Sequence, residues 1–224
     1  MSAAEWAFEL PGEAHVLFTA RAAGNLSSVR GAGRDRAQET REALRERLGV
    51  RRIARGRQVH GAVVARVDDC DHDDGALAEA DGQATARSGV GVMVLTADCL
   101  PVALAGSAAV AMVHAGWRGI AAGVLEQGVL SLRELGCAEE IAAIIGPGAG
   151  ACCYEVGPEV RAALGGEART ATVDLQAAAR RRLRAAGVRD VRSVAACTIC
   201  DERFFSHRRE GSHAGRQGGV AWRS

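Results

Sequence analysis

The sequence predicts a layered α/β fold with a mixed, largely buried sheet, in a single domain that spans residues 1–224. Short Val-rich apolar runs alternate along the chain with amphipathic helical stretches, which is typical of strands covered by helices. Apolar residues make up 48% of the 224 residues, and no internal repeat or low-complexity linker divides them. A chain of this length buries roughly 70% of its unfolded surface, so it needs no disulfide or metal to fold.

The N-terminal half is predicted to place one helix among three strands. The helix covers 35–48, with Asp35 as a possible cap and with Leu44 and Leu48 four residues apart on one face. The predicted strands of this half are 15–19, 58–67 and 89–97. The second and third are rich in Val, which favours a buried position in a sheet.

The C-terminal half alternates four strands with three helices. The predicted strands are 101–105, 108–114, 141–145 and 188–196, and the predicted helices are 117–135, 158–164 and 174–186. Ile120, Val124 and Leu125 give the first of these helices an apolar stripe. Pro158 opens the second helix at a position where proline is favoured, and the third carries a run of Arg on its outer face.

The charged residues exclude several classes of function. Lys and Arg together number 28 against 27 Asp and Glu, a formal net charge of +1, so we expect no nucleic-acid partner. Every basic residue is Arg. The absence of Lys excludes a Walker-type phosphate loop, a kinase-type lysine and a pyridoxal Schiff base, because each of them requires a lysine amine.

The apolar stretches and the cysteines predict a cytoplasmic protein. The longest apolar stretches are far shorter than the ~20 residues of a membrane span, so we expect no membrane contact. Residues 1–11 lack a basic segment followed by a long apolar run, so no secretory signal is expected. The seven cysteines are then expected to be reduced, which makes metal binding or catalysis the question for each. We expect a monomer or homodimer.

His60, Cys99 and His114 form the first candidate site, since each closes or follows a predicted strand and strand ends meet at a common rim. Two imidazoles and one thiolate suit zinc, and three protein ligands leave a fourth position open for a reactant. Zinc lowers the pKa of water bound to it to around 7. The alternative is that Cys99 is a small buried apolar residue and that the two His are hydrogen-bonded structural residues, because their spacing matches no compact zinc signature.

Two glycine-rich turns are candidate anion sites. Residues 116–119 open a predicted helix, where exposed backbone amides attract anions and Arg118 could bind a phosphate through two hydrogen bonds. Residues 146–150 follow a predicted strand and form a second candidate. The alternatives are an Arg118 that faces solvent and, for 146–150, a tight turn, which we favour.

Cys152, Cys153, Cys197 and Cys200 are a third candidate, since four thiols could hold a closed zinc site. We do not expect structural zinc here, because neighbouring side chains in extended backbone diverge and there is no second pair of cysteines separated by two residues.

Several segments taken together resemble one known family. In chain order they are 58–61 (QVHG), 80–82 (ADG), 96–102 (TADCLPV), 114–119 (HAGWRG), 145–147 (IGP), 152–157 (CCYEVG) and 204–206 (FFS) with Arg208 and Arg209. The sequence resembles the bacterial YfiH/YlmD-like proteins, labelled multicopper polyphenol oxidase or laccase domain and described as purine nucleoside phosphorylases with adenosine deaminase activity. The segments cover most of the chain.

The resemblance implies roles for particular residues. The metal ligands of the family fall on His60, Cys99 and His114, which implies zinc at a substrate pocket, with Asp98 and Arg118 nearby. Its early substrate-binding segment falls on Arg21 and Asn25. The stretch 24–36 lacks the family's usual glycine-rich and acidic elements, and His207 stands where Tyr is common.

The leading hypothesis is therefore a zinc enzyme that acts on purine nucleosides. It would release the base of adenosine, inosine or methylthioadenosine to phosphate, giving ribose 1-phosphate, with the phosphate held by Arg118 and Arg21. It would also deaminate adenosine by attack of activated water at C6, with Asp98 as the candidate for proton transfer.

Three alternatives differ from this hypothesis. Copper is less expected than zinc, because six His in the whole chain are too few for the blue site and trinuclear cluster of a multicopper oxidase. A cysteine-dependent amide hydrolase that edits cell-wall precursors is the alternative enzyme, with Cys99 as nucleophile and His114 as base. The third is a non-catalytic partner protein that retains the fold.

Overall fold

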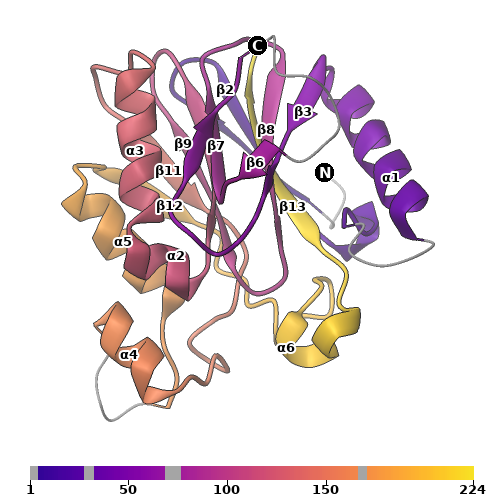
Figure 1. Ribbon diagram of the computed structural model, residues 1–224, viewed down its shortest axis with the longest axis vertical. Helices are drawn as coiled ribbons and strands as arrows, with labels where there is room; N and C mark the ends of the chain where they lie inside the picture. The colour runs from indigo at the N-terminus through magenta and orange to yellow at the C-terminus, as the bar shows by residue number, and fades with distance from the viewer. Residues whose placement is uncertain (1–4, 28–32, 69–76, 166–170) are drawn as a thin grey trace.

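The computed structural model describes residues 5–27, 33–68, 77–165 and 171–224. Within them the strands form two large sheets that pack face to face, with helices on both outer sides (Figure 1). This confirms the predicted mixed α/β class, although the strands divide into two sheets where the sequence suggested one. The structure is thus layered as helix, sheet, sheet and helix.

One sheet has five strands in the order β1-β2-β13-β8-β3. Their bounds are β1 Glu5–Leu10, β2 Ala14–Thr19, β13 Gln217–Arg223, β8 Val90–Thr96 and β3 Arg52–Ala54. All neighbours are antiparallel except β3 and β8. Helix α1 (Gly33–Leu48) covers the outer face, where Leu44 and Leu48 pack with Leu17 and Met93. The helix begins two residues before the predicted start, and the side chain of Asp35 lies outside the described part.

The second sheet has six strands in the order β12-β11-β9-β10-β7-β5. Their bounds are β12 Asp190–Ser193, β11 Ala142–Ile145, β9 Leu100–Ala105, β10 Val110–Ala115, β7 Gly82–Thr85 and β5 Val64–Arg66. The outermost pair at each edge is parallel and the central pairs are antiparallel, so the sheet is mixed. A two-stranded parallel sheet of β4 (Gly56–Arg57) and β6 (Leu77–Glu79) completes the strands of the described residues.

Helices α2 (Trp117–Ala122), α3 (Val124–Glu134) and α5 (Leu175–Ala185) lie on the outer face of the six-stranded sheet (Figure 1). Helix α3 approaches the sheet closely because it has Gly128 at the contact. A Cβ at Gly128 would lie 2.7 Å from a methyl carbon of Leu104. Short helices α4 (Pro158–Leu164), α6 (His207–Glu210), η1 (Arg21–Ala23) and η2 (Gly211–His213) lie in the connections.

Central strands are buried on both faces, which explains their continuous apolar runs. On β9, Val102 and Leu104 face the helices, whereas Ala103 packs against the other sheet together with Met112 of β10 and Phe18 of β2. Each of these side chains is almost completely buried. Burial on both faces removes the alternation of polar and apolar residues that marks a half-exposed strand.

The predicted helix 117–135 is wrong as a single element, because the chain forms two helices there. Gly123 separates α2 from α3 in the left-handed region, with φ +91°. Its N–H still bonds to the Gly119 and Ile120 carbonyls, so it ends α2 as a helix cap.

The predicted strand 58–67 is also wrong over most of its length. Only β5, which begins at Val64, is extended in the sheet, and residues 58–63 form a loop in which His60 has φ +60°. The backbone N–H groups of Val59, His60 and Gly61 bond to the carboxylate of Asp81 rather than to a neighbouring strand.

Strands β1, β3, β4, β6, β7 and β13 were not predicted. Strand β13 was missed because Gly218 and Gly219 weaken the residue pattern typical of a strand. A Cβ at Gly219 would lie 2.8 Å from Pro101 Cβ and 2.9 Å from Met112 Sδ, so the two sheets need a glycine there to pack closely. None of the helices in the described ranges is long and apolar enough to cross a bilayer.

Candidate metal centre and substrate site

Two loops and the end of one strand bring three side chains together at one end of the six-stranded sheet. These are His60, Cys99 and His114, hereafter the trio. His60 lies in the loop after β4, Cys99 directly precedes β9, and His114 lies near the end of β10. One potential ligand atom from each residue lies within 4.8 Å of the other two. The two imidazole rings are edge to face, with centroids 4.9 Å apart. His114 is buried and His60 is exposed, so the trio is open to solvent on the His60 side.

Asp81 holds both histidines in place, and sequence reasoning did not assign it a role. Its carboxylate is completely buried and accepts His114 Nδ1–H at 2.7 Å through Oδ1. It also accepts the backbone N–H groups of Val59, His60 and Gly61 at 2.7–3.1 Å. One side chain therefore fixes the ring of one histidine and the loop that carries the other. The only sequence signal for it was its place in the ADG segment.

The charges of the trio are coupled to one another. Burial raises the pKa of the Cys99 thiol, but the charge and hydrogen bonds of His114 and His60 outweigh this and lower it to about 6. Burial lowers the pKa of His114, but the Cys99 thiolate and the Asp81 carboxylate outweigh it and raise it to about 9. Without a metal, Cys99 and His114 therefore form a thiolate–imidazolium pair at neutral pH.

Asp81 is ionised in this arrangement. Its burial raises the pKa of the carboxyl group, but hydrogen bonds from His114, Gly61 and Val59 hold the pKa below its usual value. Because the carboxylate accepts Nδ1–H, Nε2 is the ring nitrogen of His114 that remains to face Cys99 and His60. An imidazole oriented by a carboxylate in this way is the usual arrangement around metal-bound histidines.

The chemistry of the donor set fits zinc. A buried imidazole, a solvent-facing imidazole and a preformed thiolate are borderline-soft ligands, and three protein ligands with an open side are typical of catalytic rather than structural zinc. His60, Cys99 and His114 are the residues that could hold the ion. Of the groups in the described part of the chain that could hold a metal, this is the one that contains histidine. It does not offer the additional imidazoles of a trinuclear copper cluster.

Gly116 is required for space beside the trio. A Cβ at this position would lie 2.9 Å from Cys99 Sγ and 3.2 Å from His60 Cδ2. The chain then enters α2, where Arg118 is exposed and stacks over the Trp117 ring at 4.3 Å. Arg118 thus faces solvent, which agrees with the alternative interpretation of residues 116–119. Its guanidinium group can still bind an anion there.

Arginines and one tyrosine surround the trio. Burial lowers the pKa of half-buried Arg216, and the negative charges of Cys99 and Asp98 act in the opposite direction. Burial and the Cys99 charge raise the pKa of Tyr154, whereas Arg208 and Arg118 oppose the shift. Arg208 also stacks over the Tyr154 ring at 5.2 Å. Tyr154 and Arg208 stood in the resembling segments without an assigned role, and Arg216 had no sequence signal.

Asp98 is buried next to Cys99 and joins two distant segments. Its Oδ1 accepts the hydroxyl of Thr198 at 2.7 Å, and its Oδ2 accepts the backbone N–H of Arg208 at 2.7 Å. It has φ +86°, an unusual conformation for a residue other than glycine. These contacts give Asp98 a positioning function, and its predicted part in proton transfer stays a prediction.

Arg21 and Asn25 contact the C-terminal segment, which also carries Arg208 and Arg216. Arg21 makes an ion pair with Glu210, donates to the Phe204 carbonyl at 2.8 Å and stacks over Phe205 at 4.3 Å. Asn25 Oδ1 accepts the backbone N–H of Arg216 at 2.8 Å. Both residues therefore position the C-terminal segment around the trio, and their predicted contact with substrate stays a prediction.

The turn at 146–150 does not form an anion cradle. The N–H groups of Gly146, Gly148 and Ala149 donate to the carbonyls of Pro101, Ala196 and Asp98. Gly150 N–H donates to Cys197 Sγ at 3.2 Å. Because these donors are already used, the segment is the tight turn that we favoured from the sequence.

The four other cysteines converge, so the prediction that they would not is wrong. Cys152, Cys153, Cys197 and Cys200, hereafter the thiol cluster, have all their Sγ atoms within 4.8 Å of one another. Cys152 and Cys153 lie in a tight turn rather than in extended backbone, with Cys153 N–H and Tyr154 N–H both donating to the Gly150 carbonyl. Neighbouring side chains in such a turn can face the same side.

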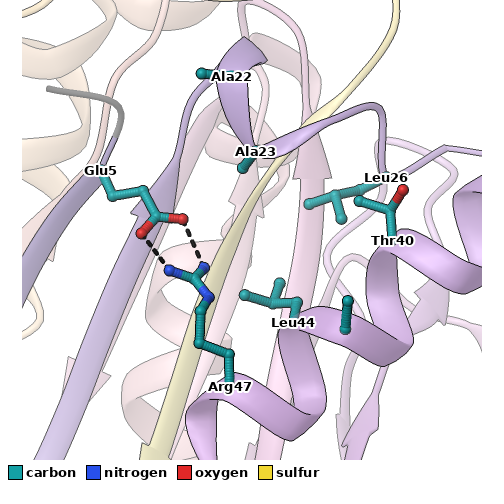
Figure 2. A pocket seen from close by; sticks show the side chains of 8 residues that line it. Glu5, Ala22, Ala23, Leu26, Thr40, Leu44 and Arg47 are labelled. Carbon is teal, nitrogen blue, oxygen red and sulfur yellow. Dashed lines mark hydrogen bonds and ion pairs between the residues drawn. The ribbon is translucent and has the colours of Figure 1, made fainter. Parts of the chain in front are cut away.

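A surface pocket of about 510 Å³ lies between α1 and the segment around η1. Figure 2 shows its lining, which includes Leu26, Thr40 and Leu44 and an ion pair between Arg47 and Glu5 with N–O distances of 2.5 and 2.6 Å. The charged groups neutralise each other, and no residue of the trio lines the pocket. It offers no chemistry comparable to that of the trio.

Known proteins resemble this chain over nearly its full length. The model of the family described as "Multi-copper polyphenol oxidoreductase laccase" matches residues 17–224. The chain is 39% identical over 232 residues to a protein of Xylella fastidiosa (strain Temecula1) named purine nucleoside phosphorylase, with 95% of this chain and 88% of the relative covered.

Solved structures of similar proteins share the fold. YlmD from Geobacillus stearothermophilus is 30% identical, with a TM-score of 0.86 and coverage of 94% of this chain and 92% of that one. YfiH from Bacillus licheniformis has a TM-score of 0.87 at 24% identity, with 94% and 93% covered. The resemblance predicted from the sequence segments is confirmed.

Proposed function

This chain belongs to the family described as multi-copper polyphenol oxidoreductase laccase, and we propose that within it the chain is a zinc-dependent purine nucleoside phosphorylase. Its substrates would be adenosine, inosine and methylthioadenosine together with phosphate, and it would also deaminate adenosine. Support comes from relatives named purine nucleoside phosphorylase at up to 39% identity. We further propose that residues 1–224 form one catalytic domain and that the protein is a cytoplasmic monomer or homodimer.

The observation that carries the proposal is the convergence of His60, Cys99 and His114 in front of the buried Asp81. Zinc held by these three side chains would act as a Lewis acid toward a substrate atom at the open side. The chain prepares this position itself, because Asp81 holds the proton on His114 Nδ1 and the charge of His114 keeps Cys99 ionised. Little reorganisation is then required when the ion or substrate binds.

Phosphate would be held by the arginines that border the trio. Arg118 is exposed at the start of α2, and Arg208 and Arg216 lie on the C-terminal segment opposite. A guanidinium group can bind a phosphate through two parallel hydrogen bonds. A phosphate oxygen would attack C1′ of the ribose as the bond from C1′ to the purine nitrogen breaks. The base leaves with the bonding electrons and takes up one proton, and ribose 1-phosphate forms.

Tyr154 and Asp98 would act on the nucleoside side. The ring of Tyr154 lies beside Arg208 and is half-buried, so it offers a flat surface for a purine. Asp98 is our candidate for proton transfer in the deamination of adenosine, in which water adds at C6 and ammonia leaves. Asn25 and Arg21 would support both reactions by holding the segment that carries Arg208 and Arg216.

A second candidate is favoured by one specific observation. A carboxylate, an imidazole and a thiolate lie next to one another in the order Asp81, His114 and Cys99. Cysteine hydrolases use the same spatial arrangement. In that case Cys99 would attack an amide carbonyl, as in an enzyme that edits cell-wall precursors. Zinc at the trio and a covalent Cys99 intermediate exclude each other, because both use the same sulfur.

Turnover by purified protein tests the proposal. We expect phosphate-dependent release of base from inosine and methylthioadenosine, and ammonia from adenosine, with loss of nearly all activity in Cys99→Ala. Cys137→Ala is the matched control, since Cys137 is a buried core residue away from the trio and should keep the activity. Equal turnover by wild type and Cys99→Ala would remove Cys99 from the mechanism.

Chelation and alkylation separate the two candidates. The zinc phosphorylase should lose activity with a chelator, regain it with zinc and resist alkylation of Cys99 while zinc is bound. The hydrolase should survive chelation, lose activity on alkylation and cleave amide substrates. Activity that persists through both treatments would contradict both candidates.

A further inference from the structure

We propose that the thiol cluster is a second metal site, a closed tetrathiolate site for one Zn²⁺ ion. This site is separate from the trio, and the inference does not depend on the proposed activity. No disulfide joins any of the six cysteines in the described part of the chain. Each thiol would give its proton to solvent as its sulfur binds the ion, so no oxidation or reduction takes place.

The sulfur positions fit one ion. Four of the Sγ–Sγ distances are 3.4 Å between Cys152 and Cys153, 3.3 Å between Cys152 and Cys200, 3.4 Å between Cys153 and Cys197, and 2.8 Å between Cys153 and Cys200. Four sulfurs bound tetrahedrally at a Zn–S distance of about 2.3 Å are about 3.8 Å apart. Small outward movements would therefore admit the ion, and four soft ligands without oxygen or nitrogen favour zinc among abundant divalent ions.

The backbone around the cluster is shaped for it. Gly150 N–H donates to Cys197 Sγ at 3.2 Å, a contact that favours the thiolate. A Cβ at Gly150 would lie 3.2 Å from the sulfurs of both Cys152 and Cys197, so the glycine leaves room for them. Cys197 and Cys200 are two residues apart in a turn closed by the Asp201 N–H to Cys197 carbonyl bond. Such a turn is the usual way that two cysteines from one loop bind zinc.

The cluster also joins two loops that border the substrate site. Cys153 precedes Tyr154, whose ring lies under Arg208. Thr198, within the second loop, donates to Asp98 at 2.7 Å, and Arg209 holds the same loop through the Thr198 and Ile199 carbonyls. An ion in the cluster would therefore fix the wall of the site without contacting substrate.

Metal content of the purified protein gives the first test. We expect two zinc ions per chain in wild type, one in Cys99→Ala and one in the double variant Cys152→Ala/Cys200→Ala, whose two positions are exposed. Cys137→Ala should keep two. If the trio binds no metal, wild type and Cys99→Ala should each hold one ion and the double variant should hold none. That result would overturn the metal site at the trio and would support the site at the thiol cluster. A double variant with as much zinc as wild type would overturn the cluster site.

Cobalt substitution gives a test that does not depend on the double variant folding. Cys99→Ala loaded with Co²⁺ should show sulfur-to-cobalt charge-transfer absorption about fourfold that expected of a one-thiolate site, because four sulfurs bind the ion. In the zinc-loaded protein the cluster thiols should resist alkylation until a chelator is added. Thiols that require a reductant before they react would show disulfides instead and would contradict the proposal, as would absence of the absorption.

Discussion

Replacement of Asp81 by Asn should damage both the fold and the metal centre. The two side chains have nearly the same shape, but the amide carries one acceptor oxygen where the carboxylate carries two. If the amide nitrogen replaces Oδ2, it faces the N–H groups of Val59 and Gly61. If it replaces Oδ1, it faces the N–H of His60 and Nδ1 of His114. The first orientation breaks two hydrogen bonds. The second breaks the one from His60 and keeps the one with His114 only if the proton leaves Nδ1.

The cost of Asp81→Asn follows from these broken bonds. A buried donor left without an acceptor costs about 1–3 kcal/mol, so one or two such donors cost about 1–6 kcal/mol of unfolding free energy. The residue also orients His114, and loss of such a contact weakens metal binding about 10–100-fold, which is about 1.4–2.8 kcal/mol. If the amide donates to His114 Nδ1, that nitrogen carries no proton and the proton of the neutral ring lies on Nε2. Zinc can then bind Nε2 only if the hydrogen bond to the amide breaks.

Urea unfolding of the metal-free protein and zinc competition with a chelator measure the two effects separately. Asp190→Asn is the matched control, because Asp190 is exposed and its ion pair with Arg192 is on the surface. We expect it to change the unfolding free energy by less than about 0.5 kcal/mol. An Asp81→Asn protein that matches this control in stability and binds zinc within twofold of wild type would refute the assigned function of Asp81.

Three further predictions concern the surroundings of the trio. In the metal-free protein the Cys99 thiolate should form with a midpoint near pH 6, because the His114 charge outweighs the effect of burial on the thiol pKa. The ultraviolet absorbance of the thiolate measures this midpoint, and a value near pH 9 would contradict the prediction. Gly116→Ala should weaken zinc binding at least about tenfold, since the new Cβ would lie 2.9 Å from Cys99 Sγ; unchanged affinity in a chelator competition would show that the site has room. Thr198→Val should lower the unfolding free energy by about 1–3 kcal/mol, because Asp98 Oδ1 loses its hydroxyl donor; a urea midpoint equal to that of wild type would contradict it.

Controls for these measurements are available in the same chain. Cys99→Ala supplies the blank for the thiolate absorbance, because the remaining cysteines are unchanged. Thr40→Val is the matched control for Thr198→Val, since the Thr40 hydroxyl bonds within α1 in an exposed contact and its loss should cost little.

The sequence predicted the strands of the core because their apolar runs report burial on both faces. Segments 89–97, 101–105 and 141–145 match β8, β9 and β11 to within about two residues at each end. It did not predict β13, whose glycines serve a close contact with the other sheet that is visible only in three dimensions. The division of the strands into two sheets likewise depends on pairing between distant segments.

The sequence predicted those residues of the candidate site whose side-chain type alone indicates metal binding. His60, Cys99 and His114 stood out because imidazole and thiolate are metal ligands that followed strand ends. Asp81 was not assigned because a carboxylate in a sequence can be solvated, and only its burial and its hydrogen bonds show that it holds the loop of His60. The thiol cluster was misjudged because the assumed extended backbone is in fact a turn.

Zinc-edge anomalous diffraction from crystals of the zinc-loaded protein tests the central claim most directly. The account predicts a peak about 2.0–2.1 Å from one nitrogen of His60 and from Nε2 of His114, and about 2.3 Å from Cys99 Sγ. That peak should vanish in Cys99→Ala. The claim would be contradicted by zinc-loaded crystals in which His60, Cys99 and His114 share no anomalous peak.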